Sequence, residues 1–253
     1  MPIPGLVGWW QLKDGSGTIA TDSSGNGNNG NLIDGPTWIF TGPNGGGLSF
    51  RGFPVSNDSV RIPRAAVLEP AAITVSAWFK GPQAQNFRQS VFCKAFAEDV
   101  PPTFQSYQIG VQGTGDPTAA IFTIGIAGAT SELLVSGIIL DNTSWQNLTG
   151  TYDPAAPAPQ QLLYSNGTLI GSLTNASPIA YDLTPAGDLY IASNSDPSIN
   201  HKVYVGSVDD CRIYNRALTA QEVREIYNSD VSTNIFSLRG HHSGSRMTPP
   251  YNP

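Results

Sequence analysis

The sequence predicts an all-β protein built as a sandwich of two antiparallel sheets. Charged residues make up only 13% of the chain, about half of the roughly 25% found in typical globular proteins. The 253 residues include 27 glycines and 20 prolines, which supply turns throughout. Between those turns, short apolar runs recur roughly every 8–12 residues, which is the strand spacing of a sandwich. A hydrophobic fraction of 40% provides for a sizeable core.

The first strands alternate with polar turns. Leu6–Leu12 has the β-branched and aromatic character of a strand and runs into a turn at Asp14–Gly17. Ala20–Gly30 is rich in Gly and Asn, which tolerate positive φ, so we expect a polar loop there. Short strands are expected at Gly47–Phe50 and Ser59–Ile62.

The central strand is the clearest. Ile73–Lys80 alternates apolar and polar side chains, which predicts one buried face. Asn166-Gly167 lies between two apolar runs and predicts a tight hairpin turn. The remaining strands, for a total of about fourteen, are expected at Ser90–Phe96, Tyr107–Gln112, Ala119–Ala127, Glu132–Gly137, Trp145–Tyr152, Gln161–Ser165, Thr168–Leu173, Leu189–Ala192 and Val203–Tyr214.

One short helix is expected to close the domain. Thr219 is a good N-cap, and Glu222 three residues later completes a capping box. Leu218 and Val223 are placed for the hydrophobic staple that accompanies such a box. No linker composition interrupts the chain before this helix, so we predict one domain over residues 1–228, followed by an extended arm over residues 229–253.

Several segments resemble the laminin-G-like domains of the concanavalin A type. The stretch DDCRIYNRALT resembles the family's closing strand, DEVRIYNRALS. The opening GLVGWWQLKDGSG resembles GLVAYWPFDEGSG in the same way. Further matches follow in family order, so the resemblance covers Gly5 to Asn228 and leaves the arm unexplained. They are Asp22–Gly27, Gly47–Phe50, Val60–Pro63, Thr74–Lys80, Trp145–Asp153 and Leu163–Gly167.

The resemblance implies a concanavalin A-like jelly roll that serves as a binding module, often for glycans and often with a structural calcium. Such a calcium would draw on the carboxylates of Asp22 and Asp209 and on other oxygens of the loop after Asp22. Lys13 stands where the family commonly has Asp, which removes one ligand. The alternative is that Asp22 caps its own turn and that Asp209 pairs with Arg212 or a backbone N–H.

No catalytic pattern is found, and we predict a protein that is not an enzyme. Glycan-cleaving relatives use two carboxylates at a fixed separation, which on a strand would lie two or four residues apart. Asp209 and Asp210 are adjacent, so we expect them on opposite faces, and Glu132 stands alone. The pair His241-His242 lies between Gly and Ser, where a solvated surface position is expected.

The five tryptophans suggest both core packing and ligand binding. Trp9, Trp10, Trp78 and Trp145 match framework positions of the family, so we expect them in the core. Trp38 lies in a segment rich in Pro and Gly and is the best candidate for an exposed aromatic that holds a sugar ring. Burial of Trp38 remains the open alternative.

Composition restricts the partners. The net charge of −6 and the pI near 4.9 argue against nucleic acid. No apolar run approaches the roughly 18 residues of a membrane span, and no signal peptide is visible. Cys93 and Cys211 are expected as two buried thiols, with a single disulfide between them as the alternative.

The arm leads to the functional prediction. It carries four large apolar or aromatic residues that could grip another subunit, although packing along its own sandwich is the alternative. We predict a non-enzymatic homo-oligomeric protein of a larger assembly, such as a virion surface or capsid decoration protein. The alternative is a stand-alone extracellular glycan-binding module. The predicted partner-binding residues are Ile235, Phe236, Leu238 and Tyr251.

Overall fold

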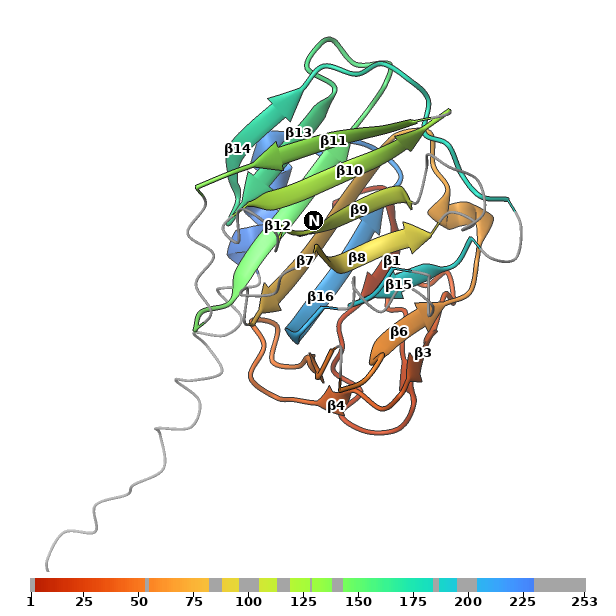
Figure 1. Cartoon of the computed structure of the whole chain (residues 1–253), viewed down its shortest axis with the longest axis vertical. Helices are drawn as coiled ribbons and strands as arrows, with labels where there is room; N and C mark the ends of the chain where they lie inside the picture. The colour runs from red at the N-terminus through yellow and green to blue at the C-terminus, as the bar shows by residue number, and fades with distance from the viewer. Residues whose placement is uncertain are drawn as a thin grey trace, which may run out of the picture.

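Two antiparallel sheets packed face to face form the protein, as predicted (Figure 1). The computed structural model describes residues 3–52, 55–81, 88–95, 105–112, 119–127, 129–137, 143–183, 187–194 and 204–229. Within these residues each sheet has eight strands. No helix in this described part has the length and apolar character that crossing a membrane requires.

The first sheet, sheet A, is organised around its last strand. Its order is β14-β13-β12-β7-β16-β5-β4, and β1 also pairs with β16. One edge of β16 pairs with β7, while the other pairs first with β5 and then with β1. The strands are β1 (Leu6–Trp10), β4 (Thr37–Trp38), β5 (Leu48–Phe50), β7 (Ile73–Lys80), β12 (Gln146–Tyr152), β13 (Gln161–Ser165), β14 (Thr168–Leu173) and β16 (Gly206–Tyr214).

The second sheet, sheet B, has the order β11-β10-β9-β8-β15-β6-β3-β2. A short 3-10 helix, η1 (Ala66–Leu68), follows β6. The strands are β2 (Ile19–Ala20), β3 (Gly30–Ile33), β6 (Ser59–Ile62), β8 (Gln89–Ala95), β9 (Gln105–Val111), β10 (Ala120–Ile126), β11 (Ala129–Val135) and β15 (Leu189–Ile191).

Three strands were missed by the sequence analysis, namely β2, β3 and β4. They have two to four residues each, too few to show an alternating pattern. The expected loop over Ala20–Gly30 is therefore bounded by strand residues at both ends, because Ala20 pairs with Gly30.

The core lies between the two sheets. Trp10 is fully buried there, and its ring meets Phe92 edge-on with centroids 5.7 Å apart. The other framework tryptophans lie elsewhere, which corrects the prediction for them. Trp9 and Trp145 are only half-buried, and Trp78 is buried on the outer face of sheet A. Adjacent strand residues point to opposite faces, so Trp9 and Trp10 could not both enter one core.

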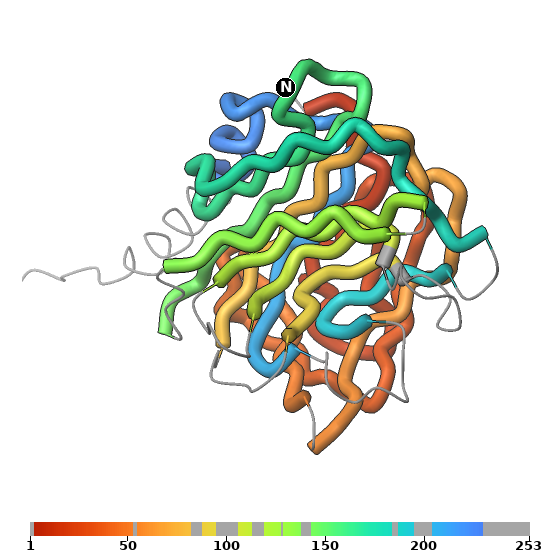
Figure 2. Tube along the Cα trace, turned by 45° about the horizontal axis from the view of Figure 1, so that its top comes forward, coloured from red at the N-terminus to blue at the C-terminus, as the bar shows by residue number. Residues whose placement is uncertain are grey.

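A helix over residues 220–229 covers the outer face of sheet A, and Figure 2 shows it beside the start of the chain. Tyr227 of this helix stacks on Trp78, with ring centroids 5.3 Å apart. Thr74 donates to the Arg216 carbonyl at 2.8 Å and accepts the Leu218 N–H at 2.9 Å. Both faces of β7 are consequently buried, although its alternation predicted one.

Local predictions for the helix and the hairpin are confirmed. The Thr219 N–H donates to Glu222 Oε2 at 2.9 Å, and the Glu222 N–H donates to Thr219 Oγ1 at 3.3 Å, which is the capping box. Val223 is buried against the sheet. Asn166 and Gly167 have φ of 49° and 73°, as the tight turn between β13 and β14 requires.

The two cysteines are buried thiols that form no disulfide, as expected. Cys93 lies on β8 of sheet B, and Cys211 lies on β16 of sheet A. Burial raises the pKa of the Cys211 thiol well above its usual value. It is therefore a packing residue and not a reactive thiolate.

Candidate functional site

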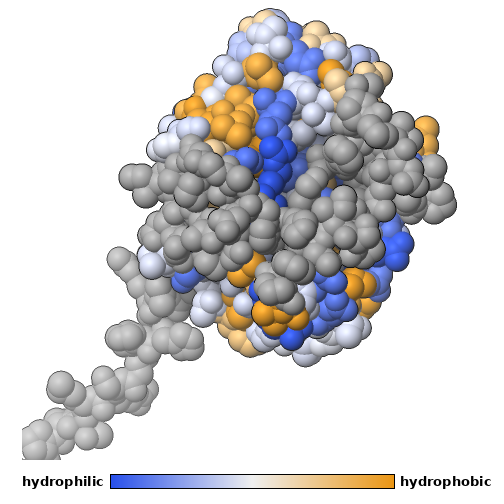
Figure 3. All heavy atoms as spheres, viewed as in Figure 1, coloured by the Kyte–Doolittle hydropathy of each residue, from blue (hydrophilic) through white to orange (hydrophobic). Residues whose placement is uncertain are grey.

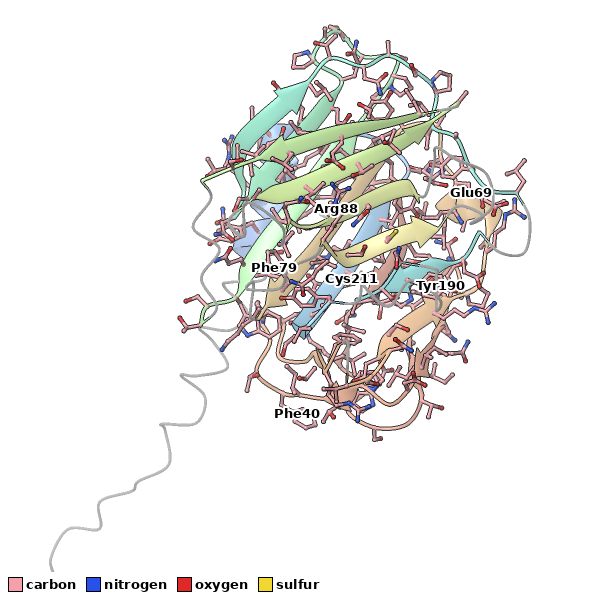
Figure 4. All side chains as sticks on the ribbon, viewed as in Figure 1. Phe40, Glu69, Phe79, Arg88, Tyr190 and Cys211 are labelled. Atoms are coloured by element: carbon pink, nitrogen blue, oxygen red, sulfur yellow. The ribbon has the colours of Figure 1, made fainter. Side chains whose placement is uncertain are left out.

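An exposed aromatic side chain marks one end of the sandwich. Phe40 follows β4 and is 72% exposed, and Figure 4 shows it at the lower edge of the molecule. Its ring covers the turn at Gly15, where an added Cβ would lie 3.2 Å from the ring. We call residues 11–23 together with 37–44 the Phe40 edge.

Trp38, the aromatic predicted from the sequence, lies two residues before Phe40. It is half-buried, because it packs against the core. Its Nε1–H donates to the Gly17 carbonyl at 3.0 Å. Trp38 and Phe40 therefore both contact the turn at Asp14–Gly17, and they fix its position.

A polar pocket of about 210 Å³ lies at the same turn. The Asp14 carboxylate at its wall accepts the Thr21 hydroxyl at 2.5 Å and the Thr21 N–H at 3.3 Å. Hydroxyl, carboxylate, ammonium and amide groups are thus grouped next to an exposed aromatic ring. That combination suits a sugar, whose C–H face packs on an aromatic and whose hydroxyls take hydrogen bonds. The pocket is lined by Gln11, Leu12, Lys13, Asp14, Thr21 and Ser23.

Lys13 and Asp209 belong to one network at the inner side of this edge. Lys13 Nζ donates to Asn44 Oδ1 at 2.6 Å, and the Asn44 N–H donates to Asp209 Oδ2 at 2.9 Å. Asp209 is fully buried. The lysine charge thus lies against the loop that holds the Asp209 carboxylate.

Asp22 occupies a different network. Its carboxylate accepts backbone N–H groups from Trp9, Ser24 and Asn28 at 2.9–3.0 Å, and it also accepts the Ser24 hydroxyl at 2.9 Å. The bond from the Ser24 N–H closes the turn that Asp22 itself begins. The oxygens of the Asp22 carboxylate are therefore used by hydrogen-bond donors of β1 and of the loop that follows Asp22.

These contacts do not fit the calcium site expected at Asp22 and Asp209. Calcium takes six to eight oxygen ligands, whereas both carboxylates accept N–H groups here. In the part of the chain described, no three His, Cys, Asp or Glu residues gather as metal ligands. Calcium at Asp22 and Asp209 stays a prediction from the resemblance, and the contacts of both carboxylates oppose it.

A β-bulge on β16 corrects the prediction that Asp209 and Asp210 face opposite sides. The pairing of β16 with β7 shifts between Asp209 and Arg212, and Asp210 has a φ of 49°. Asp209 pairs with Trp78 on the outer side of sheet A. Asp210 Oδ1 accepts the Trp9 Nε1–H, and its Oδ2 lies 2.6 Å from the Arg212 guanidinium. Both carboxylates therefore lie on the outer side, because the bulge interrupts the alternation.

A separate group of buried charges joins η1 to sheet B. Lys94 is fully buried on β8, and its ammonium contacts the Gly187 carbonyl and lies 3.1 Å from the Glu69 carboxylate. Burial lowers the pKa of Lys94, while Glu69 opposes that shift. Arg64 holds the same carboxylate at 2.8 Å, near the position labelled for Glu69 in Figure 4. The Lys94 and Glu69 side chains are 0% and 6% exposed and that of Arg64 is 29% exposed, so the two buried charges are balanced within the fold.

The predicted arm residues lie outside the described residues. Ile235, Phe236, Leu238 and Tyr251 all follow residue 229, where the description ends.

The two-sheet antiparallel fold is a β-sandwich of the lectin type. The sequence profile of the concanavalin A-like lectin/glucanases superfamily matches residues 54–224. The chain belongs to this family. No sequence among the curated proteins matches the chain.

Solved structures share this fold at low sequence identity. The binding domain of Paraclostridial Mosquitocidal Protein 1 aligns with a TM-score of 0.65 and 16% identity, over 89% of this chain and 52% of that one. The chain thus spans about half of that domain. The Trypanosoma rangeli sialidase aligns with a TM-score of 0.66 and 16% identity, over 92% of this chain and 34% of the sialidase. Domain 4 of the Geobacillus stearothermophilus arabinanase AbnA, in complex with arabinotriose, aligns with a TM-score of 0.63 and 18% identity. The alignment covers 88% of this chain and 98% of that domain.

Proposed function

We propose that this protein is a non-enzymatic recognition domain that binds carbohydrate at the Phe40 edge. The observation that carries this proposal is the 72% exposed ring of Phe40, which lies against Gly15, the residue after Asp14 of the polar pocket. A single exposed apolar side chain is ordinary on a protein surface, so the proposal depends on the ring and the polar side chains of the pocket meeting at the same turn.

The solved neighbours support a binding role. One is a domain of a glycosidase seen with an arabinose oligosaccharide, and it matches over nearly its whole length. Another is the binding domain of a mosquitocidal protein. Their ligands belong to those proteins, and the proposal for this chain is limited to carbohydrate as a class.

The buried acids support a role without catalysis. Asp209 and Asp210 are the adjacent carboxylates on one strand face, and they are 0% and 1% exposed. A glycoside hydrolase needs both carboxylates to flank the scissile bond. Asp209 and Asp210 are instead used by Asn44, Trp9 and Arg212 within the fold.

A glycan array followed by titration calorimetry tests the carbohydrate proposal. Phe40→Ala should weaken the best array ligand about tenfold, which equals about 1.4 kcal/mol of binding free energy. Leu169→Ala is the matched control: Leu169 is 50% exposed on β14, at the opposite end of sheet A. Figure 3 shows apolar side chains on the upper left, where β11 and β14 lie. An array without ligands, or equal affinity for Phe40→Ala, would reject the proposal.

A second candidate is a structural role in an assembly, such as a virion surface or a capsid decoration. The feature that favours it is the arm sequence, in which Ile235, Phe236 and Leu238 lie close together and Tyr251 lies near the end. Light scattering tests this role. The full chain should be an oligomer and a chain ending at Asn228 a monomer, whereas two monomers would count against it.

A further inference from the structure

A second pocket, of about 320 Å³, lies between the helix 220–229 and strands β1 and β16, and we call it the helix pocket. Most of its lining is apolar or aromatic. Its walls come from the start of the chain and from the last helix, which Figure 2 shows side by side. Among the described residues its lining is Ile3, Leu6, Trp9, Arg212, Tyr214, Glu225, Ile226 and Ser229.

The two charged side chains of the helix pocket differ in their surroundings. The Arg212 guanidinium lies 2.6 Å from the Asp210 carboxylate and 5.1 Å from the centre of the Trp9 ring. Its charge is therefore balanced by a buried acid. Glu225 is exposed on the helix and accepts the Gln221 side-chain N–H at 2.9 Å. Within the described residues no cation pairs with Glu225, so the pocket favours an apolar group followed by a basic one.

The chain itself supplies such a segment. Ile235-Phe236-Ser237-Leu238-Arg239 places three large apolar side chains directly before an arginine. Ser229 lines the helix pocket and is the last described residue, so Ile235 is six residues beyond the pocket wall. Six extended residues span at most about 20 Å, enough to return across a pocket of this size.

The charge of the arm and the short tether before Ile235 both favour docking of this segment onto its own molecule. The chain carries a net charge of −6, whereas residues 230–253 hold two arginines, two histidines and a single acid. A tether of five residues also gives the segment an effective concentration in the millimolar range. Docking onto the pocket of the same molecule is then favoured over docking onto another copy.

We propose that the helix pocket binds the Ile235–Arg239 segment of the same chain, with Phe236 against the apolar wall and Arg239 beside Glu225. The rest of the arm, including Tyr251, is left to reach a partner. This inference goes beyond carbohydrate binding and does not depend on it, because the Phe40 edge is built from other residues.

Limited proteolysis of the full chain by chymotrypsin tests the docking. The enzyme cuts after Phe236, Leu238 and Tyr251, so Tyr251 is an internal control within the same arm. We expect cleavage after Phe236 and Leu238 to be at least tenfold slower than cleavage after Tyr251. Mass spectrometry of the released fragments gives the three rates.

Charge-reversal variants test the partners of the segment. Glu225→Arg and Arg239→Glu should each speed cleavage after Phe236 severalfold, and the double variant should restore the protection. Thr168→Arg, exposed on β14, changes the net charge elsewhere and should leave the rates as they are. Circular dichroism before digestion confirms that each variant is folded.

Two results would overturn the proposal. In the first, Phe236 and Leu238 are cut as fast as Tyr251, and no variant changes the rates. In the second, the protection is lost on dilution while light scattering shows an oligomer, which would place the segment on another copy. A protein that shows the protection but binds no glycan would retain this inference and reject only the carbohydrate proposal.

Discussion

At the scale of single residues, Asp210 shows how a local backbone irregularity places a charge. Its φ of 49° is uncommon for a residue other than glycine, and Asp is among those that tolerate it. The bulge directs the carboxylate to Trp9 and Arg212 on the outer side of sheet A. The buried guanidinium is thereby balanced where β1 meets β16.

Asp210→Asn should lower the free energy of unfolding by about 2 kcal/mol, because a hydrogen-bonded buried ion pair becomes a charge beside a neutral amide. Asn keeps the size of Asp and also tolerates positive φ, so the variant isolates the charge. Urea denaturation measures the change. Asp34→Asn is the control, since Asp34 has a φ of 56° but is exposed, and it should change stability by less than about 0.5 kcal/mol. Equal effects of the two variants would contradict this role for Asp210.

At the scale of one element, the closing helix depends on Glu222. The Arg216 guanidinium binds this carboxylate at 2.6 Å, and its hydrogen bonds lower the pKa of Glu222 from 4.5 to about 2. The Thr219 N–H and hydroxyl act in the same direction. Because the pKa is lower in the folded state, the stabilisation is complete above about pH 5 and is lost as the pH falls from 4.5 toward 2.

Glu222→Gln should therefore lower the free energy of unfolding at pH 7 but not at pH 2. The variant keeps an acceptor for the capping box and removes only the charge. The ion pair is partly exposed to solvent, so we expect a difference on the order of 1 kcal/mol. Denaturation of both proteins across this pH range gives the answer. A difference that is constant with pH would assign the effect to packing and not to ionisation.

Elements that depend on residues close in the chain were predictable from the sequence, whereas elements that depend on distant contacts were not. The sequence predicts β7, the Asn166-Gly167 turn and the capping box, because each depends on residues that are close in the chain. It did not predict that Trp78 lies under Tyr227, since that contact depends on where the last helix packs. Phe40 was missed as well. Its position two residues after Trp38 was a usable signal, but its exposure depends on the turn at Gly15.

At the scale of the whole molecule, the Phe40 edge joins segments that are far apart in the chain. Asp209 on β16 accepts the Asn44 N–H, and the Asn44 side chain accepts a hydrogen bond from the Lys13 ammonium. The turn after Lys13 lies under Phe40. The sheet order makes this possible, because β16 pairs with both β5 and β1. The family resemblance implied that Asp209 lies near the loop after Asp22, whereas the hydrogen-bond partners of these residues required the structure.

The same network determines what calcium should do. In this chain the Asn44 N–H donates to the Asp209 carboxylate, and the Lys13 ammonium binds the side chain of the same Asn44. A specific calcium ion at 100 times its Kd stabilises a protein by about 3 kcal/mol, which for this chain length would raise Tm by several degrees. We therefore expect EGTA and calcium to leave the Tm of the protein unchanged in calorimetry.

Lys13→Asp provides the matched test, because it removes the ammonium and adds a carboxylate near Asp209. Repulsion between the two acids should lower the Tm of this variant in EGTA, and calcium should then raise it by several degrees, since the ion would neutralise both groups. Magnesium, which demands a tighter octahedral shell, should have a smaller effect. If calcium raises the Tm of the unmodified protein as well, the ion binds despite Lys13, and the contacts of Asp22 and Asp209 must rearrange to admit it.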